Sequence, residues 1–200
     1  MEAFEEELRA QGFRIVAGLD EAGRGPLAGP VVAAAVVLAP SKKLAGIDDS
    51  KKLSPEQREK LFPLILQQAA AVGVGMIEAQ EIDRLNILRA SLKAMEQAVQ
   101  NLPLAPDFLL IDGIHLLSLP LAQRAIPKGD QRCQSIAAAS IVAKVTRDRL
   151  MFAYHNAYPQ YNFARHKGYG TKEHLQAIRQ YGCCPLHRQS FKPIYQLSLL

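Results

Sequence analysis

The sequence of 200 residues has no tryptophan and only three cysteines. Cys183 and Cys184 are adjacent and Cys133 stands alone, and this odd set excludes the disulfide framework of a small secreted domain. A zinc site made of Cys183, Cys184 and His187 is an alternative, although adjacent cysteines match no usual ligand spacing. We expect reduced thiols, as in a cytoplasmic protein.

A long hydrophobic run is also missing. The longest uncharged apolar stretch, residues 30–40, is shorter than the roughly 18 residues that a membrane-spanning helix requires. The N-terminus is acidic and does not resemble a signal peptide. We therefore expect a cytoplasmic protein with no membrane partner.

The composition excludes a disordered chain. Hydrophobic residues make up 48% and charged residues 22% of the sequence, as in globular domains with a packed core. The length suffices for one α/β domain with a small appendage. We assign residues 1–155 to a core and residues 156–200 to a C-terminal helical segment packed on it as one structural unit, and we expect a monomer.

Apolar runs rich in β-branched residues alternate with helical patterns along the chain. Strands are expected at residues 15–19, 30–38, 72–77, 108–111 and 124–128, and helices at residues 55–70, 87–102, 134–155 and 172–181. Ser54 and Thr171 are the expected N-caps of the first and last of these helices. A hairpin followed by interleaved helices and strands predicts an α/β fold with a mixed sheet flanked by helices.

Acidic side chains follow three of the expected strands. Asp20 and Glu21 come after the first strand, Asp112 after the fourth and Asp130 after the fifth. Because sites in open α/β sheets gather at strand ends, we expect these carboxylates to meet in space. Each of them alone is also a common turn residue.

Asp20 and Glu21 are neighbours in the chain, and side chains alternate faces along a strand. We therefore expect the strand to bend there, so that both carboxylates reach one site. Gly23 and Gly25 would permit that departure from strand geometry.

The four carboxylates form a donor set of oxygen atoms alone, which suits Mg²⁺ or Mn²⁺ better than zinc. Two such ions, about 3.5–4 Å apart, can activate water and stabilise the leaving oxygen in phosphodiester hydrolysis. The formal net charge of +5 includes basic pairs in or beside expected loops and helix ends, which would suit a phosphodiester backbone. For any single pair, a solvated surface is the alternative.

These motifs have two other interpretations. Paired acids also serve glycoside hydrolysis, but the basic flanks and the absence of tryptophan argue against it. Residues 23–28 fit the loose dinucleotide-binding pattern G-x-G-x-x-G/A. That pattern requires a following helix, whereas a proline and a valine-rich strand follow here.

Six segments match, in order, the motifs of one known family. They are GLDEAGRGP at residues 18–26, DDSKKL at 48–53, IDG at 111–113, KGD at 128–130, SIAAASIVAKVTRD at 135–148 and HKGYGT at 166–171. In these motifs the chain resembles ribonuclease HII. The resemblance implies a ribonuclease H-like fold and a metal-dependent endoribonuclease that hydrolyses RNA in RNA/DNA hybrids. It also implies cutting 5′ to single ribonucleotides in duplex DNA, leaving 5′-phosphate and 3′-hydroxyl ends.

The resemblance also implies roles for individual residues. The metal-binding catalytic carboxylates would be Asp20, Glu21, Asp112 and Asp130. The backbone of Gly23, Arg24 and Gly25 would read the ribose 2′-hydroxyl, the group that distinguishes RNA from DNA. Tyr169 would stack on the sugar at the RNA-to-DNA junction.

Further substrate contacts are expected from basic and polar side chains. Ser140, Lys144 and Arg147 share one face of the helix at residues 134–155, and phosphate contact is the hypothesis for them. A solvated basic face is the alternative. For Lys51, phosphate contact is likewise the hypothesis and a solvated surface the alternative. A binding domain without catalysis and another nuclease or recombinase of similar fold are the competing functions.

Overall fold

The computed structural model describes residues 3–39, 46–47 and 53–197 of the chain. Lys51 and most of the matching motif at residues 48–53 lie outside this range. A five-stranded sheet with the order β3-β2-β1-β4-β5 forms the centre of the fold. Its strands are β1 (Val16–Ala22), β2 (Val31–Leu38), β3 (Ala69–Ile77), β4 (Phe108–Asp112) and β5 (Ala122–Ile126).

The sheet is mixed, as the sequence predicts. β1 and β2 form an antiparallel hairpin, and β3 pairs antiparallel with β2. β4 lies parallel to β1, and β5 lies parallel to β4. The C-terminal ends of β1, β4 and β5 therefore meet at one edge of the sheet.

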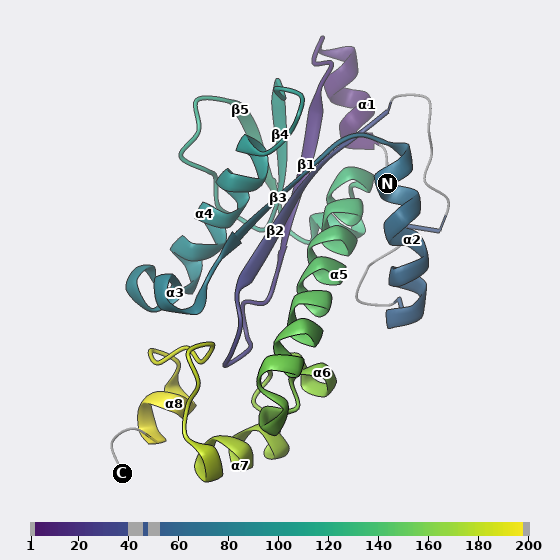
Figure 1. The fold of residues 1–200 in the computed structure, drawn as a ribbon. Coiled ribbons are helices and arrows are strands. Elements are labelled where there is room, and N and C mark those ends of the chain that lie inside the picture. Colours follow the sequence, from purple (N-terminus) through teal and green to yellow (C-terminus); the bar gives the residue numbers. More distant parts are fainter. Residues whose placement is uncertain (1–2, 40–45, 48–52, 198–200) are drawn as a thin grey trace.

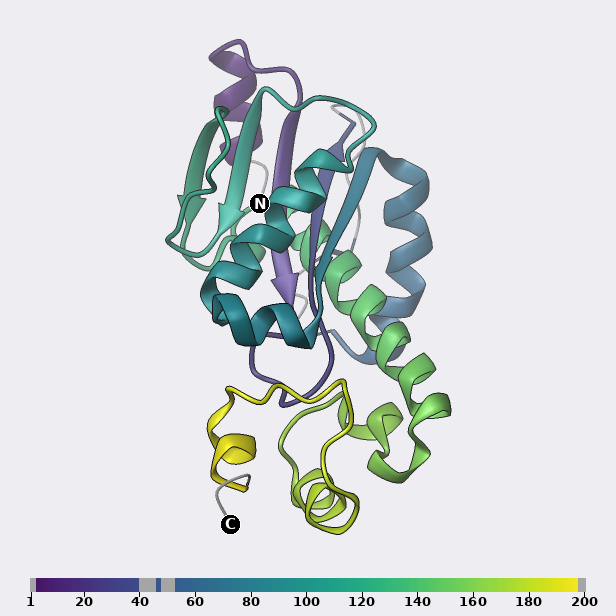
Figure 2. The same cartoon turned by 60° about the vertical axis from the view of Figure 1, so that its left-hand side comes forward.

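Helices cover both faces of the sheet (Figure 1). α2 (Pro55–Gln68) and α5 (Gln134–Ala157) lie on one face, while α3 (Ala79–Leu85) and α4 (Ile87–Gln100) lie on the other (Figure 2). Alternate residues of the strands supply the two cores: Ala33 and Ala35 pack in the cluster with α4, and Ala34 and Val36 in the cluster with α5. The apolar runs are thus buried on both faces.

The remaining elements lie around this three-layer core. They are α1 (Ala3–Ala10), η1 (Gly129–Gln131), η2 (Pro159–Tyr161), α6 (Phe163–His166), α7 (Lys172–Tyr181) and α8 (Lys192–Leu197). The C-terminal elements pack around the far end of α5, where Phe163, Ile178 and Ile194 surround Met151 and Leu27. No helix in the described part of the chain is long and apolar enough to cross a membrane.

The expected helix caps are confirmed. The Ser54 hydroxyl accepts a hydrogen bond from the Gln57 amide at 3.2 Å, and the Gln57 side chain accepts one from the Ser54 amide at 2.7 Å. This reciprocal pair is a capping box at the start of α2. Thr171 caps α7 by accepting a hydrogen bond from the His174 amide at 3.2 Å.

Several elements differ from the sequence-based expectation. The short helices α1, α3, α6 and α8 were not expected. Of these, α3 is only seven residues long, and its N-cap Glu78 makes no capping hydrogen bond with its side chain. β5 lies at Ala122–Ile126 and ends before Pro127. Proline has no amide hydrogen to donate to a sheet, so the strand cannot extend through it as a regular ladder.

Candidate active site

The expected catalytic carboxylates lie at the edge where the parallel strands end. β1 carries Asp20 and Glu21 near its C-terminal end, and Asp112 is the last residue of β4. The register between these strands pairs Leu19 with Ile111, which brings the next residues, Asp20 and Asp112, level with each other. Asp130 follows β5 in the short helix η1.

One cavity of about 310 Å³ brings together most of the expected site. Its lining includes the carboxylates of Asp20, Glu21 and Asp112, the turn residues Gly23, Arg24 and Gly25, and the side chains of Ser140, Lys144 and Tyr169. Asp130 is fully buried and does not line this cavity. Residues from the ends of β1 and β4, a turn and α5 therefore share one space.

Asp20 is the most enclosed carboxylate of the cavity, with 5% of its surface exposed. Its Oδ1 accepts a hydrogen bond from the Glu21 amide at 2.7 Å, and its carboxylate also accepts one from the Ser140 hydroxyl. Burial raises the pKa of Asp20 well above its usual value, and repulsion from Glu21 and Asp112 raises it further.

Glu21 has a cationic neighbour as well. Arg24 donates a hydrogen bond from Nη1 to Oε1 of Glu21 at 3.2 Å. Burial raises the pKa of Glu21, while Arg24 acts in the opposite direction. Arg24 thus partly offsets the negative charge of the site.

Asp112 connects two of the strand ends. Its Oδ1 accepts a hydrogen bond from the Gly129 amide at 2.6 Å. Because Gly129 precedes Asp130, this bond fixes the start of η1 relative to β4. The position of Asp130 therefore depends on Asp112.

The expected bend in β1 is wrong. β1 stays paired with β2 through Ala22, and Asp20 and Glu21 lie opposite Ala34 and Ala33 in a continuous register. Their side chains consequently point to opposite faces of the sheet. Both side chains reach the site because it extends around the end of the strands, from one face of the sheet to the other.

A second cavity illustrates this arrangement. It measures about 320 Å³, lies beside α4, and is lined by Glu21, Asp112 and the α4 residues Ser91 and Met95. Asp20 instead faces α5, where Ser140 binds it. Glu21 and Asp112 line both cavities, so the two open at the same edge.

The residues present fit divalent cations by their chemistry. All four expected ligands offer oxygen atoms only, which is the preference of hard cations. Burial and the neighbouring carboxylate of Asp112 raise the pKa values of both Asp20 and Glu21, so their charged forms are disfavoured, and a bound cation would offset this cost. Nevertheless, the described residues contain no group of three or more His, Cys, Asp or Glu side chains arranged to hold a metal ion.

The zinc site considered as an alternative is not formed. Cys183 is exposed, whereas Cys184 is buried. Within residues 53–197, the buried Cys184 and His187 contact each other at 3.2 Å between Sγ and Nδ1, but no third ligand completes a metal-binding group.

The glycines of the turn have different surroundings. Gly23 has a φ of 97°, and a Cβ there would lie 2.1 Å from Nε of Arg147. A Cβ on Gly25 would meet only Cε1 of Tyr169, at 3.6 Å. Tyr169 is 46% exposed, so Gly25 and the tyrosine ring together present an open surface to the cavity.

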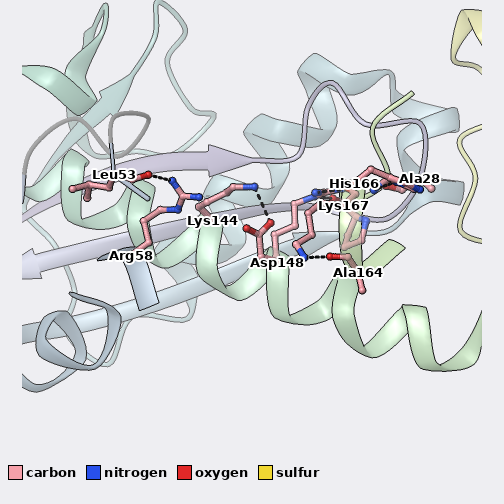
Figure 3. A network of polar contacts seen from close by, with 11 residues as sticks. Ala28, Leu53, Arg58, Lys144, Asp148, Ala164, His166 and Lys167 are labelled. Carbon is pink, nitrogen blue, oxygen red and sulfur yellow. Dashed lines mark hydrogen bonds and ion pairs between the residues drawn. The ribbon is translucent and has the colours of Figure 1, made fainter. Parts of the chain in front are cut away.

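Two basic side chains, Lys144 and Arg58, line the cavity together with the carboxylates. Figure 3 shows both of them and their polar contacts. Lys144 pairs with Asp148 at 2.8 Å, one turn further along α5. Arg58 of α2, for which no role was expected, donates a hydrogen bond to the Leu53 carbonyl at 2.6 Å. Only its proximity to the expected N-cap at Ser54 could have drawn attention to it.

The expectation for Arg147 is wrong. Its side chain is 1% exposed, so it can neither contact phosphate nor form a solvated basic face. It donates hydrogen bonds to the carbonyls of Pro30 and Ala28 instead. The position of Arg147 on the helix face could not reveal its burial, because the loop that covers it lies far away in the sequence.

The mixed sheet, its covering helices and the carboxylates at its edge define a nuclease with a ribonuclease H-like fold. The model of the family Ribonuclease HII matches residues 17–194. The chain belongs to the ribonuclease HII family. The members of this family are divalent-metal-dependent nucleases that act on RNA/DNA substrates.

Curated proteins and a solved structure agree with this assignment. The chain is 56% identical over 192 residues to ribonuclease HII of Syntrophus aciditrophicus (strain SB). The aligned residues cover 96% of this chain and 91% of that protein. It is 56% identical over 194 residues to ribonuclease HII of Bacillus licheniformis, covering 97% and 76% respectively. The ribonuclease H2 structure from Pyrococcus horikoshii OT3 matches with a TM-score of 0.80 and 28% identity, over 93% of this chain and 98% of that one.

Proposed function

We propose that this chain hydrolyses RNA in RNA/DNA hybrids and cuts 5′ to single ribonucleotides in duplex DNA, leaving 5′-phosphate and 3′-hydroxyl ends. One observation carries the proposal: Asp20, Glu21 and Asp112 line the same cavity as Gly25 and Tyr169. The groups suited to phosphodiester hydrolysis thus adjoin a surface suited to a ribose.

The four carboxylates are the proposed ligands of Mg²⁺ or Mn²⁺: Asp20, Glu21, Asp112 and Asp130. When bound, such ions activate water and stabilise the leaving oxygen of the phosphodiester. Ser140 orients Asp20 through its hydrogen bond, and the Gly129 amide orients Asp112. These contacts would hold the oxygen donors in place before an ion arrives.

Recognition of the ribose is assigned to the turn and to Tyr169. Arg24 and Gly25 are exposed, so their backbone groups can approach a 2′-hydroxyl closely. The ring of Tyr169 lies next to Gly25 and can pack against the sugar. Lys144 is the proposed phosphate contact from α5, and a substrate phosphate would compete with Asp148 for it.

We further propose that the chain acts as a monomer in the cytoplasm. Cys133, Cys183 and Cys184 are all free thiols, the state that a reducing compartment maintains. Size-exclusion chromatography with light scattering tests the monomer, and a mass of two chains would contradict it.

The function is tested with a labelled DNA duplex that contains one ribonucleotide. Cleavage is measured with Mg²⁺, with Mn²⁺ and with a chelator, next to the same duplex made of DNA alone. We expect metal-dependent cutting only on the 5′ side of the ribonucleotide. Binding of the duplex by folded protein without any cutting would favour a binding domain that lacks catalysis, and cutting of the DNA control would favour another nuclease.

A further inference from the structure

Two arginine side chains are buried behind the Gly23–Gly25 turn. Arg147 of α5 is 1% exposed, and Arg188, which precedes α8, is 0% exposed. In the part of the chain that the structure describes, neither guanidinium forms an ion pair with a carboxylate. Burying such charges without counterions is costly, so their hydrogen bonds must compensate.

Arg188 binds the carbonyl groups of the turn itself. Its Nη2 donates to the Gly23 carbonyl at 2.7 Å, and its Nη1 donates to the Arg24 carbonyl at 3.1 Å. Its Nε and Nη2 both donate to the Gly29 carbonyl, at 3.0 and 2.8 Å. The planar guanidinium therefore fixes the two ends of the loop relative to each other.

Arg147 connects the same loop to the segment that carries Tyr169. Its Nε donates to the Pro30 carbonyl at 2.9 Å, and its Nη2 donates to the Ala28 carbonyl at 3.1 Å. Its Nη1 donates to the Lys167 carbonyl at 3.0 Å. Ala28 and Lys167 both belong to the polar network of Figure 3.

These bonds determine the direction of the peptide groups in the turn. The described chain contains no cis peptide bond, and in a trans peptide the carbonyl and the following amide hydrogen point in opposite directions. Because the carbonyls of Gly23 and Arg24 point inward to Arg188, the amides of Arg24 and Gly25 point away from it. Among the described residues, neither amide donates a hydrogen bond to another group.

We infer that Arg188 and Arg147 are positioning residues for ribonucleotide recognition, because they turn the amides of Arg24 and Gly25 outward and fix the turn next to the Tyr169 segment. This inference rests on the proposed function. Neither arginine touches the substrate in this scheme. Each acts through backbone groups that do.

The chemistry of the guanidinium explains why arginine occupies both positions. Burial lowers the pKa of Arg147 to about 10 and that of Arg188 to about 9, so both remain charged at neutral pH. A charged donor forms stronger hydrogen bonds to carbonyl groups than a neutral one. Lysine has a single donor atom and cannot bind several carbonyls in a plane.

The test compares the wild type with Arg188→Lys. We measure KM for a duplex with one ribonucleotide, and Ki for the same all-DNA duplex as a competitive inhibitor. The ratio of Ki to KM reports recognition of the ribonucleotide and does not depend on the fraction of folded enzyme. We expect Arg188→Lys to lower this ratio about tenfold, as when one hydrogen bond is lost, while Ki is retained.

A second variant keeps the inference testable if Arg188→Lys does not fold. Asp83 anchors the segment of Arg188 by accepting hydrogen bonds from the Gln189 and Ser190 amides, both at 2.9 Å. Asp83→Ala removes the anchor of that segment without replacing either arginine. We expect the same fall in the ratio, by about threefold.

Ile194→Ala is the matched control. Ile194 is buried in the C-terminal cluster and does not bind the turn, so this variant weakens packing only. An unchanged ratio in folded Arg188→Lys would overturn the inference, as would an equal fall in Ile194→Ala. If Arg188→Lys does not fold, an unchanged ratio in Asp83→Ala overturns it. A wild type with Ki equal to KM, or without cleavage, would instead refute the proposed function itself.

Discussion

Glu5 of α1 caps the N-terminus of α5 by accepting a hydrogen bond from the Ser135 amide at 2.9 Å. The same oxygen accepts bonds from the Ser135 hydroxyl at 2.9 Å and from Cys133 Sγ at 3.0 Å. Cys133, the N-cap residue, makes no capping bond of its own. A residue 130 positions away therefore does what an N-cap side chain usually does.

Replacing this capping carboxylate should destabilise the fold. We expect Glu5→Ala to lower the free energy of unfolding by about 2 kcal/mol, because it leaves helix-end donors unsatisfied. Glu6→Ala, at an exposed position of the same helix, is the control and should change little. Urea denaturation of both variants measures the difference, and equal midpoints would show that Glu5 does not cap α5.

Asp112→Asn should separate activity from stability. It removes one of three neighbouring carboxylates, so we expect cleavage of the ribonucleotide duplex to fall by about a hundredfold or more. The melting temperature should stay the same or rise, because a charge that repels Asp20 is lost. Glu59→Gln, outside the site, is the control, and near-normal turnover of Asp112→Asn would contradict the assignment.

The two glycines of the turn should respond differently to alanine. Gly25→Ala should keep the melting temperature, since its Cβ would meet only Tyr169 at an ordinary contact distance of 3.6 Å. Its cleavage of the ribonucleotide duplex should fall about tenfold or more if the ribose occupies that space. Gly23→Ala should unfold more easily, by about 1–2 kcal/mol or more, because of its positive φ and the contact with Arg147. Full activity of Gly25→Ala would remove the turn from the substrate site.

Tyr169→Ala should weaken cleavage without weakening the fold. The ring is 46% exposed, so its loss costs little packing. Loss of aromatic stacking should reduce kcat/KM at a single ribonucleotide by about tenfold. Tyr181→Ala, which removes a ring that is 53% exposed on α7, is the matched control. Equal rates for the two variants would leave Tyr169 without a role in binding.

Acid should destabilise the C-terminal part through its buried histidines. Burial lowers the pKa of His166, His174 and His187, and that of His174 reaches about 4. The unfolded chain binds protons below about pH 6.5, whereas the folded chain keeps His174 neutral down to about pH 4. Stability should therefore fall as the pH decreases from 6.5 to 4, by at most about 1.4 kcal/mol per pH unit for each histidine.

Urea unfolding at several pH values measures the slope of the free energy of unfolding against pH. His174→Gln should reduce it, because one proton fewer is taken up on unfolding. His115→Gln alters an exposed histidine and serves as the control. An identical slope in His174→Gln and the wild type would exclude His174 as its source.

Local patterns predicted much of the fold. The apolar runs of β2 and β3, the capping box at Ser54 and the cap at Thr171 depend on neighbours within a few residues, so the sequence contains the signal. α3 was missed because it is short and lacks a capping bond from its N-cap side chain. The strand end at β5 was misplaced because the backbone pairing, which a sequence does not display, determines it.

The sequence by itself determined the α/β class, the acidic residues at three strand ends and the family motifs, since these depend on residue type and spacing. Only the tertiary structure decided that β1 continues straight and that the site lies across the sheet edge. It also assigned Arg147, Arg188 and Glu5 to buried backbone contacts. Apart from Lys167, which Arg147 also binds, these partners lie more than a hundred residues away. Such contacts form only when distant segments pack against one another.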